Sequence, residues 1–302
     1  MKTESKFDLN TVITDQFIQA LEAGTVPWHK PWGQGANLAP VGGGGRPYRG
    51  INRIITSMAG YDRPEWLTIK QINKRGGRIL KDEHHTKVTL WQFSYCDSEG
   101  KWMKETEAMI RIRKGERLRK TGFLKYYRVW NIRQTDLAVD EYKPEVEAED
   151  SVVEAECQAI LDGWADRPKY RLERNHSRAF YSPATDHIEM PKRGSFDGAS
   201  EYWHTLFHES VHATGHSARL DRGLDTKLAA FGSADYSEEE LVAEIGAAFL
   251  GGMVGSMDAP TFDNAKAYLA NWASKLKGDP KLVIKAAGKA QKAVDSIVDT
   301  GL

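Results

Sequence analysis

Residues 208–216 read HESVHATGH, and the types and spacing of these residues fit a metal site. His208 and His212 are four residues apart, so on a helix both imidazoles leave the same face, one turn apart. Glu209 lies next to the first histidine and can reach a water molecule on the ion. Two neutral imidazoles that hold Zn²⁺, with a carboxylate that takes a proton from the water, form a hydrolytic site. The motif therefore predicts a metal-dependent hydrolytic centre with Glu209 as the catalytic base.

Two histidines need a third ligand, for which the chain offers two sources. The residue six positions after His212 is an alanine, so the metzincin pattern is excluded. His216 is a candidate, but it follows a glycine at which the helix is expected to end. In EELVAE, Glu240 and Glu244 are four residues apart and share a helical face, and this spacing resembles the ExxxD of thermolysin-like zincins, in which the first acid is the ligand. We therefore expect Glu240 as the ligand and Glu244 behind a histidine.

Ser237 leaves an alternative open, because it forms the pattern S-x-x-E with Glu240. This pattern is typical of a capping box, which would use the Glu240 carboxylate at a helix N-terminus. Glu244 would then be the ligand. In either case we expect one divalent ion, with Zn²⁺ preferred and Mn²⁺ or another divalent ion as the alternative.

The site needs helices to position it, and helical patterns cover both of its parts. They are SEYWHTLFHESVHATG and SEEELVAEIGAAFLGGM, with further helices predicted over VVEAECQAILDGW and DNAKAYLANWASKLKG. AFYSPATDHIEMP predicts two short strands around a turn at 183–186. The DHIEMP strand either borders the cleft and pairs with a peptide or is an ordinary sheet strand, and His187 within it is expected at the surface. Strands followed by helices indicate an α+β fold.

The first half of the chain is also expected to be α+β. A helix is predicted over 11–24, short helices over 51–58 and 68–74, and strands over KVTLWQF, AMIRIRK and FLKYYRVWNI. Residues 26–50 are rich in Pro and Gly and predict a loop, mobile around the four glycines at 42–45.

Length and charge indicate two units. The 302 residues suffice for two domains, each with its own core. Residues 1–137 carry 24 Lys/Arg and 14 Asp/Glu, a net charge of +10, whereas the remainder has a net charge of −10. The acidic stretch DEYKPEVEAEDSVVEAE coincides with this reversal. We expect a domain over 1–138, an acidic linker over 139–152 and a second domain over 153–302, although an acidic helix inside one domain would look similar.

The composition is 40% apolar and 28% charged, which is typical of a soluble globular protein. No apolar run approaches the ~18 residues of a membrane span, and the first residues lack the layout of a secretory signal, so we expect a cytoplasmic protein. Cys96 and Cys157 lie far apart and outside any CxxC spacing, which indicates neither a disulfide framework nor a thiolate metal site.

The basic half carries a pattern suited to single-stranded DNA. Residues 111–133 contain nine basic residues and one acid, with four interleaved aromatic residues. Cations neutralise phosphates, and aromatic faces stack on unpaired bases. A half-buried strand with alternating basic and aromatic residues would look the same, but RPYRGINRIIT adds a ring, two cations and an amide after the glycine run. The expected DNA contacts are Tyr48, Arg49, Asn52, Arg53, Arg111, Arg113, Lys120, Tyr126 and Arg128.

The motifs YRGIN, FLKYYRVWNIRQT, DHIEMP, YWHTLFHESVHATGHSARLDR and EELVAEIGAAFL occur in this order. Over roughly residues 8–275 the chain resembles the ArdC-type antirestriction proteins, whose N-terminal module is shared with TraC-type plasmid primases. The resemblance implies a single-stranded DNA-binding domain joined to a zincin-like metallopeptidase domain, in proteins of conjugative plasmids that protect incoming DNA from host restriction. It gives His208, Glu209 and His212 the roles argued above.

Three functions therefore stand as hypotheses. In the first, an antirestriction protein binds single-stranded DNA and uses a metallopeptidase centre, with restriction enzymes or other host proteins as targets. In the second, the protein only shields DNA, and its metal is structural or its site inactive. In the third, a general peptidase carries an incidental basic domain.

Overall fold

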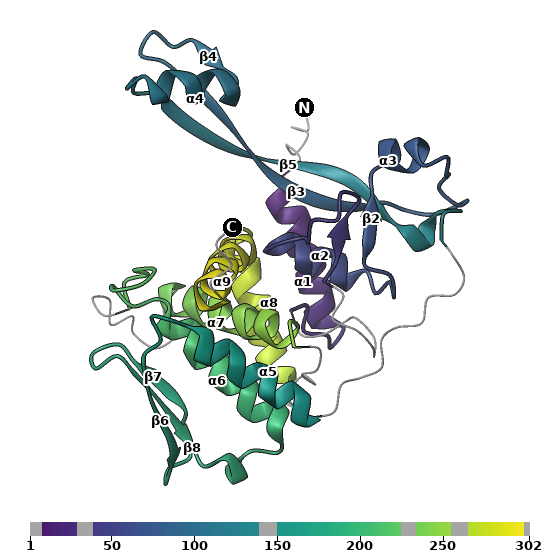
Figure 1. Ribbon diagram of the computed structural model, residues 1–302. Coiled ribbons are helices and arrows are strands. Elements are labelled where there is room, and N and C mark those ends of the chain that lie inside the picture. The colour runs from purple at the N-terminus through teal and green to yellow at the C-terminus, as the bar shows by residue number, and fades with distance from the viewer. Residues whose placement is uncertain (1–7, 29–38, 139–149, 225–233, 255–264, 299–302) are drawn as a thin grey trace.

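The computed structural model describes residues 8–28, 39–138, 150–224, 234–254 and 265–298, and Figure 1 shows an α+β fold with a long two-stranded ribbon above a helical body. The first half of the chain forms a five-stranded mixed sheet with short helices around it. Its elements are α1 (Leu9–Glu22), β1 (Val41–Gly42), α2 (Ile51–Met58), β2 (Glu65–Leu67), α3 (Ile69–Lys74), β3 (Thr86–Cys96), β4 (Trp102–Met103), α4 (Glu105–Arg113), β5 (Arg119–Asn131) and η1 (Ile132–Gln134).

Local chemistry explains where the first helices begin. The Asp8 side chain accepts a hydrogen bond from the backbone N–H of Asn10 and so caps α1. Thr68 and Gln71 form a reciprocal capping box at the start of α3. These ends agree with the predicted helices within a few residues.

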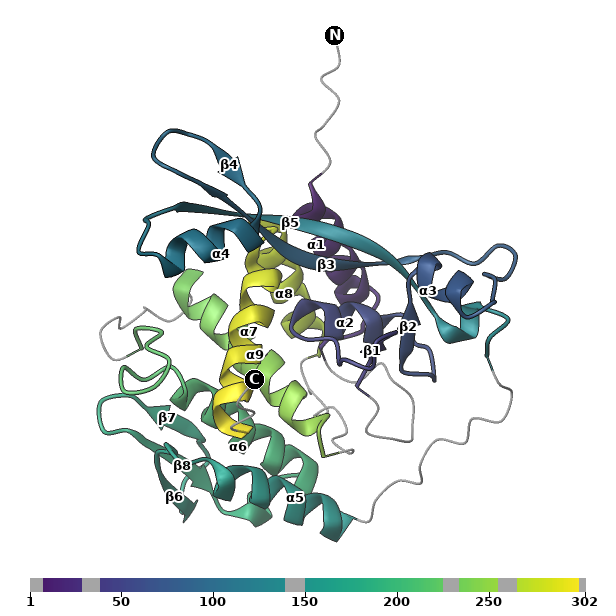
Figure 2. The same cartoon turned by 45° about the horizontal axis from the view of Figure 1, so that its top comes forward.

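The sheet has the strand order β1-β2-β5-β3-β4, and β3 and β5 form its ribbon. They pair antiparallel over eleven residues, from Thr86 opposite Val129 to Cys96 opposite Arg119. In Figures 1 and 2 the ribbon crosses above α1 and α2 and carries β4 and α4 at its far end. The strands predicted over KVTLWQF and FLKYYRVWNI are therefore confirmed.

The strand predicted over AMIRIRK is wrong, because these residues lie in and just after α4. Acids in the first turn (Glu105, Glu107) and arginines in the last turn (Arg111, Arg113) suit the helix dipole. Only Ala108 of the helix is buried, in a small cluster with Tyr95 and Met103. The alternation of apolar and basic residues thus arises on a largely exposed helix.

The four glycines form an ordered turn instead of a mobile loop. The Gly45 N–H donates to the Gly42 carbonyl at 2.8 Å, and the Gly42 N–H donates to the Arg46 carbonyl at 2.9 Å. Val41 also bridges to Pro47. The segment is therefore a small hairpin beside β2.

The second half places a three-stranded sheet beside five long helices of the described chain. Its elements are α5 (Asp150–Gly163), β6 (Lys169–Arg174), β7 (Phe180–Ser182), β8 (His187–Pro191), η2 (Arg193–Ser195), α6 (Ala199–Ala213), α7 (Ala234–Gly251), α8 (Ala265–Gly278) and α9 (Leu282–Val298). The strand order is β6-β8-β7, so the DHIEMP strand, β8, is the central strand and β7 is an edge. Of the two interpretations of DHIEMP, the ordinary sheet strand is the correct one.

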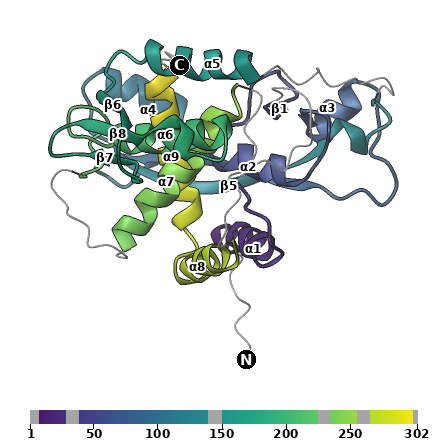
Figure 3. The same ribbon diagram turned by 90° about the horizontal axis from the view of Figure 1, so that it is seen from below.

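The two halves share one large core. Helix α1 packs against α8, which Figure 3 shows from below, and α2 packs against α9. Phe17 of α1 and Ile54 of α2 belong to the same buried cluster as Phe207 of α6 and Leu276 of α8. Trp28 meets the Trp272 ring edge to face at 5.9 Å between centroids. The expected separate cores are therefore replaced by one cluster that joins the halves, since the apolar face of α1 is covered by a helix near the chain's other end.

Part of the expected linker, 139–149, lies outside the described residues, and 150–152 form the first turn of α5. Among the helices of the described residues, none has both the length and the apolar character to cross a bilayer.

Candidate functional site

The two histidines of the motif lie on the last two turns of α6 and face each other. Their Nε2 atoms are 3.1 Å apart. Phe207 and Val211, each one residue before a histidine, lie on the adjoining face of the helix and are completely buried in the main core. The helix therefore anchors its apolar side and turns both imidazoles toward α7.

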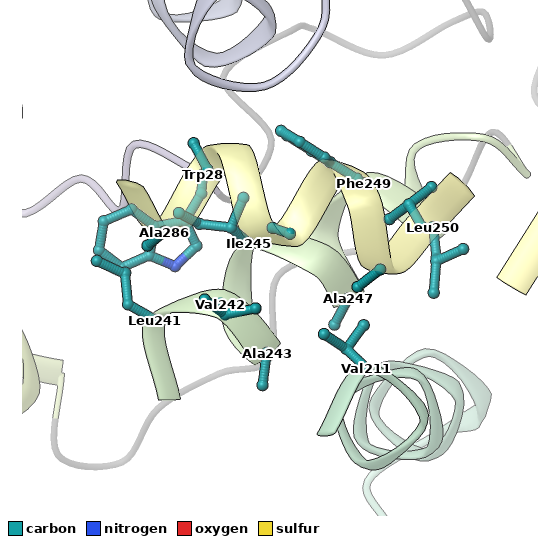
Figure 4. Packing of buried hydrophobic residues seen from close by; sticks show 14 of the residues in the cluster. Trp28, Val211, Leu241, Val242, Ala243, Ile245, Ala247, Phe249, Leu250 and Ala286 are labelled. Carbon is teal, nitrogen blue, oxygen red and sulfur yellow. The ribbon is translucent and has the colours of Figure 1, made fainter. Parts of the chain in front are cut away.

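Helix α7 can approach α6 closely because position 246 has no side chain. A Cβ atom at Gly246 would lie 2.7 Å from Val211 Cγ2. Figure 4 shows Val211 facing Ala243 and Ala247, two further small residues of α7. Close contact between these helices brings the acidic face of α7 against the histidines.

Glu240 completes a group of three ligand atoms. Its carboxylate oxygens lie 3.6 Å from His208 Nε2 and 3.5 Å from His212 Nε2, and among the described residues this trio is the group suited to hold an ion. Three donors at the usual 2.0–2.2 Å from a tetrahedral ion would lie roughly 3.3–3.6 Å apart. The two imidazole nitrogens are 3.1 Å apart and each lies 3.5–3.6 Å from one of the two Glu240 oxygens, which is close to that geometry.

The structure favours Glu240 over Glu244 as the ligand. Helix α7 begins at Ala234, so Ser237 lies inside the helix and does not occupy the N-cap position that a capping box requires. Glu244 lies on the other side of the His208 ring, with its carboxylate 3.7 Å from Nδ1. It also lies 3.8 Å from His204 Nε2. Glu244 therefore lies behind the His208 ring, next to both His208 and His204.

His212 is held by a buried ion pair that the sequence did not reveal. Glu239 Oε1 lies 3.2 Å from His212 Nδ1, and Arg222 bonds both Glu239 oxygens at 2.7 and 2.9 Å. The Arg222 guanidinium also donates to Thr214 Oγ1 and to the Val211 carbonyl. Glu239 lies between two other glutamates, so the sequence did not single it out. Only the rotation of α7 about its axis decides which glutamate faces His212.

Two pKa shifts describe the charge balance of the site. Burial lowers the pKa of His208, but the hydrogen bond to Glu240 and the charges of Glu244 and Glu209 outweigh this effect and raise the pKa to about 9. Burial raises the pKa of Glu239, yet His212 and Arg222 together hold it at about 2. The cluster is therefore strongly electronegative and suited to a divalent cation.

Glu209 is buried at the edge of the small sheet. Its Oε2 accepts a hydrogen bond of 2.7 Å from the backbone N–H of Tyr181 in β7. Since β7 pairs only with β8 in the described sheet, this N–H belongs to the free edge of the strand. The carboxylate predicted to be the base is thus fixed between α6 and β7.

Two other histidines, His216 and His187, do not have the roles or places that the sequence suggested. His216 lies beyond the end of α6, where its Nδ1 accepts a hydrogen bond from the Ala218 N–H, and it stands outside the ligand trio. His187 was expected at the surface but is buried, between Thr185 Oγ1 at 2.6 Å and Glu189 Oε1 at 3.1 Å. The prediction for His187 is wrong, because the neighbouring side chains of Thr185 and Glu189 cover this polar face of β8.

Two of the expected DNA-binding residues in the YRGIN segment make contacts within the protein. Arg53 is only 7% exposed and lies over the Phe249 ring of α7 at 4.7 Å. The Asn52 side chain is bonded to the Thr89 backbone of β3, as donor at 2.7 Å and acceptor at 2.6 Å. In this structure these side chains join α2 to α7 and to the ribbon, and their predicted DNA contacts stay predictions.

The two residues before the helix are also partly engaged. Arg49 forms an ion pair with Asp295 of α9, and the Gly50 N–H donates to Gln291 of the same helix. Tyr48 packs against the cluster of Trp66, and burial raises its pKa to about 12. This motif therefore fastens the first half of the chain to the last helix.

The remaining candidates lie on or near the ribbon. Arg111 is held between Asp97 at 3.1 Å and Glu116 at 2.7 Å, so its charge is already paired. Arg113 is exposed on α4, and Lys120 and Arg128 are exposed on β5. Tyr126 is half-buried against the main core, with Lys87 Nζ 5.7 Å from its ring. The exposed cations among the candidates are thus Arg113, Lys120 and Arg128, together with Arg49, which is paired with Asp295.

Comparisons with known proteins give one family match in each half of the chain. Residues 7–130 match the family described as the N-terminal domain of anti-restriction factor ArdC, and residues 160–289 match the zincin-like metallopeptidase family. Two DNA primases TraC of Escherichia coli are each 33% identical to the chain over 98% of its length. The chain spans only 27% and 20% of the length of these primases.

Solved structures give the same result. The metal-free crystal structure of the antirestriction ArdC protein from plasmid R388 is 32% identical, with a TM-score of 0.71 over 96% of this chain and 97% of that one. Its Mn(II)-bound structure has the same identity and TM-score, with 97% and 98% coverage. The chain thus belongs to the ArdC family of antirestriction proteins, with an ArdC N-terminal domain followed by a zincin-like domain.

Proposed function

We propose that this antirestriction protein binds single-stranded DNA and hydrolyses peptide bonds at the centre formed by His208, His212, Glu240 and Glu209. The observation that carries the peptidase proposal is the group of two imidazoles and one carboxylate, whose ligand atoms lie within 4.8 Å of one another, with the adjacent Glu209 bonded to a strand edge. Three protein ligands leave one position open, which is the arrangement of catalytic and not of structural zinc sites.

The roles of the residues follow from their positions. His208, His212 and Glu240 hold the ion, which when bound supplies Lewis-acid chemistry. Glu209 takes a proton from the attacking water at its carboxylate and later gives it to the leaving amine. The Tyr181 N–H keeps that carboxylate oriented, and Glu239 and Glu244 lie beside Nδ1 of His212 and His208, which would leave each Nε2 for an ion.

The ion is proposed to be divalent. Two imidazoles and a carboxylate are the ligand set of thermolysin-type zinc sites, which favours Zn²⁺. The R388 protein was crystallised with Mn(II), which supports Mn²⁺ as the alternative.

The DNA-binding part of the proposal is supported by the family of residues 7–130 and by the ribbon. Strands β3 and β5 contain five Lys or Arg residues and no Asp or Glu. Lys120 and Arg128 are exposed there and can contact phosphates, while Tyr126 borders them. The proposed setting is the cytoplasm of a bacterium that receives plasmid DNA, with restriction enzymes or other host proteins as targets.

Glu209→Gln tests the peptidase role. We expect hydrolysis of a protein substrate to fall by about 10²- to 10⁴-fold, the contribution of a general base, while bound metal and DNA affinity stay unchanged. Glu238→Gln is a matched control, because that glutamate of α7 pairs with Lys289. Undiminished hydrolysis in Glu209→Gln rejects the proposed base.

The same variant separates the proposal from DNA shielding. If protection against restriction in cells survives in Glu209→Gln while hydrolysis is lost, then shielding explains the antirestriction activity. If both are lost while single-stranded DNA is still bound, then the peptidase centre is needed.

A further inference from the structure

The ribbon has two faces, and their residues follow from the register. Trp91 lies opposite Leu124, Phe93 opposite Gly122, and Tyr95 opposite Lys120. Since paired residues of adjacent strands point to the same side, these side chains share one face. Leu124 and the next residue on this face, Tyr126, pack against the main core. The face therefore begins on the body and continues along the ribbon.

Trp91 is exposed at the point where this face leaves the core. It is 55% exposed, although an indole of this size is normally well buried. Neighbouring Phe93 is half-buried, with Lys120 Nζ 3.8 Å from its ring centroid. An aromatic surface and a cation are thus placed side by side.

Gly122 keeps this surface continuous. A Cβ atom at this position would lie 3.0 Å from Phe93 Cε1 and 3.5 Å from Trp91 Cε3. Both rings can therefore lie close to the backbone of β5, whereas a side chain at position 122 would push the Phe93 ring aside. The absence of a side chain here supports the two rings in one place.

The charges on the two strands of the ribbon have one sign, although Glu105 of α4 accepts a hydrogen bond from Tyr95 at the outer end of this face. Lys87, Lys120 and Arg128 lie on the same face as Trp91, and neither strand of the ribbon contains an acidic residue. An apolar protein partner would need only the aromatic rings. The cations on the same face favour an anionic ligand. Aromatic faces beside cations are the features that bind single strands, since bases stack and phosphates pair.

We propose that Trp91 is a stacking platform for an unpaired base of single-stranded DNA, with Phe93 as its side wall and Lys120 as a contact to the adjacent phosphate. The inference rests on the proposed DNA-binding function and assigns it to one face of the ribbon. Duplex DNA, whose bases are already stacked, gains nothing from this platform.

The test measures the affinity of the full chain for a fluorescent oligo(dT) at several salt concentrations. Trp91→Ala should weaken binding by about 5- to 150-fold, the effect of losing one stacked base. The slope of log affinity against log salt should not change, because stacking releases no counterions. Lys120→Gln should instead lower that slope by about 0.7. Trp91→Phe should retain most of the affinity.

Two exposed aromatic residues serve as matched controls. Trp102 is 52% exposed at the far end of the ribbon, with Arg119 5.5 Å from its ring, and Tyr127 is 46% exposed on the opposite face. Their alanine variants should bind within about 2-fold of the unchanged protein. A Trp91→Ala variant that binds equally well, or a loss that follows Tyr127→Ala instead, overturns the platform while DNA binding stands. Equal affinity of the unchanged protein for duplex also overturns it. An unchanged protein that binds no oligonucleotide refutes the DNA-binding function itself.

Discussion

The metal centre and the ribbon hold their charged side chains in opposite ways. Behind His212, Glu239 is bonded to Arg222, whose side chain is only 6% exposed. On the ribbon, Lys120 lies over the Phe93 ring and remains exposed. A buried network of opposite charges fixes the positions of its side chains. A member that loses its partner becomes an unpaired charge without water to hydrate it, which is unfavourable. Exposed cations beside aromatic rings stay hydrated and can adjust to a ligand.

This difference indicates two kinds of recognition in one chain. The centre is preorganised for one ion and one geometry, which suits chemistry. The ribbon offers π faces and exposed cations such as Lys120, which suits a polymer of varied sequence. The two regions should therefore respond differently to substitution, and the following variants test that contrast.

The largest effect is expected from His212→Ala. This change removes one of three ligand atoms, and metal affinity should fall by orders of magnitude because two protein ligands rarely hold an ion. Single-stranded DNA should bind as before. Elemental analysis of purified protein measures the first outcome and oligonucleotide titration the second. Retention of one ion per chain contradicts the proposed ligand set.

A smaller loss is expected from Arg222→Met, which removes the support of Glu239. Metal affinity should fall by about 10- to 100-fold, the usual effect of outer-shell partners. Arg219→Met is the control, because this arginine is as buried as Arg222 but pairs with the more exposed Asp186, which touches no proposed ligand. Both variants should unfold at lower temperature. If Arg219→Met weakens the metal site equally, then general loosening and not the position of Glu239 explains the result.

The centre could be predicted where its geometry is local. The i, i+4 spacing of His208 and His212 is a property of one helix, as is that of Glu240 and Glu244, so sequence alone places each pair on a face. The support by Glu239 and Arg222 could not be predicted, because it depends on how α7 turns against α6 and on a contact made beyond the end of α6.

The ribbon and the YRGIN segment show the opposite limit. Asn52 and Arg53 have the residue types of DNA ligands, but tertiary contacts with Thr89 and Phe249 engage them. Sequence gives the donors of a side chain and not the partners already bound to them. The α+β fold itself follows from periodicity, except at AMIRIRK, where alternation over a few residues also fits a short exposed helix.

For cations on and near the ribbon we expect modest effects on DNA affinity, and smaller ones where the cation already has an acidic partner. Arg128→Gln removes an exposed cation of β5 and should weaken single-stranded DNA binding several-fold, with a salt slope lower by about 0.7. Arg111→Gln should leave the slope unchanged, because Asp97 and Glu116 already neutralise this guanidinium. Titrations at low and moderate salt distinguish the two. Equal slopes for both variants contradict the grading.

The smallest effect on DNA is expected from Arg53→Met. Burial lowers the pKa of the Arg53 guanidinium to about 10, and its Nε has no hydrogen-bond partner, so the cation lacks hydration that the Phe249 ring only partly replaces. A methionine of similar length fills the same space without that cost. DNA affinity should therefore stay within about 2-fold, and the melting temperature should be unchanged or higher. Arg53→Ala, in contrast, leaves a void between α2 and α7 and should lower the melting temperature. A loss of DNA affinity in the methionine variant, with a reduced salt slope, would show that Arg53 reaches phosphate after all and that α2 moves when DNA binds.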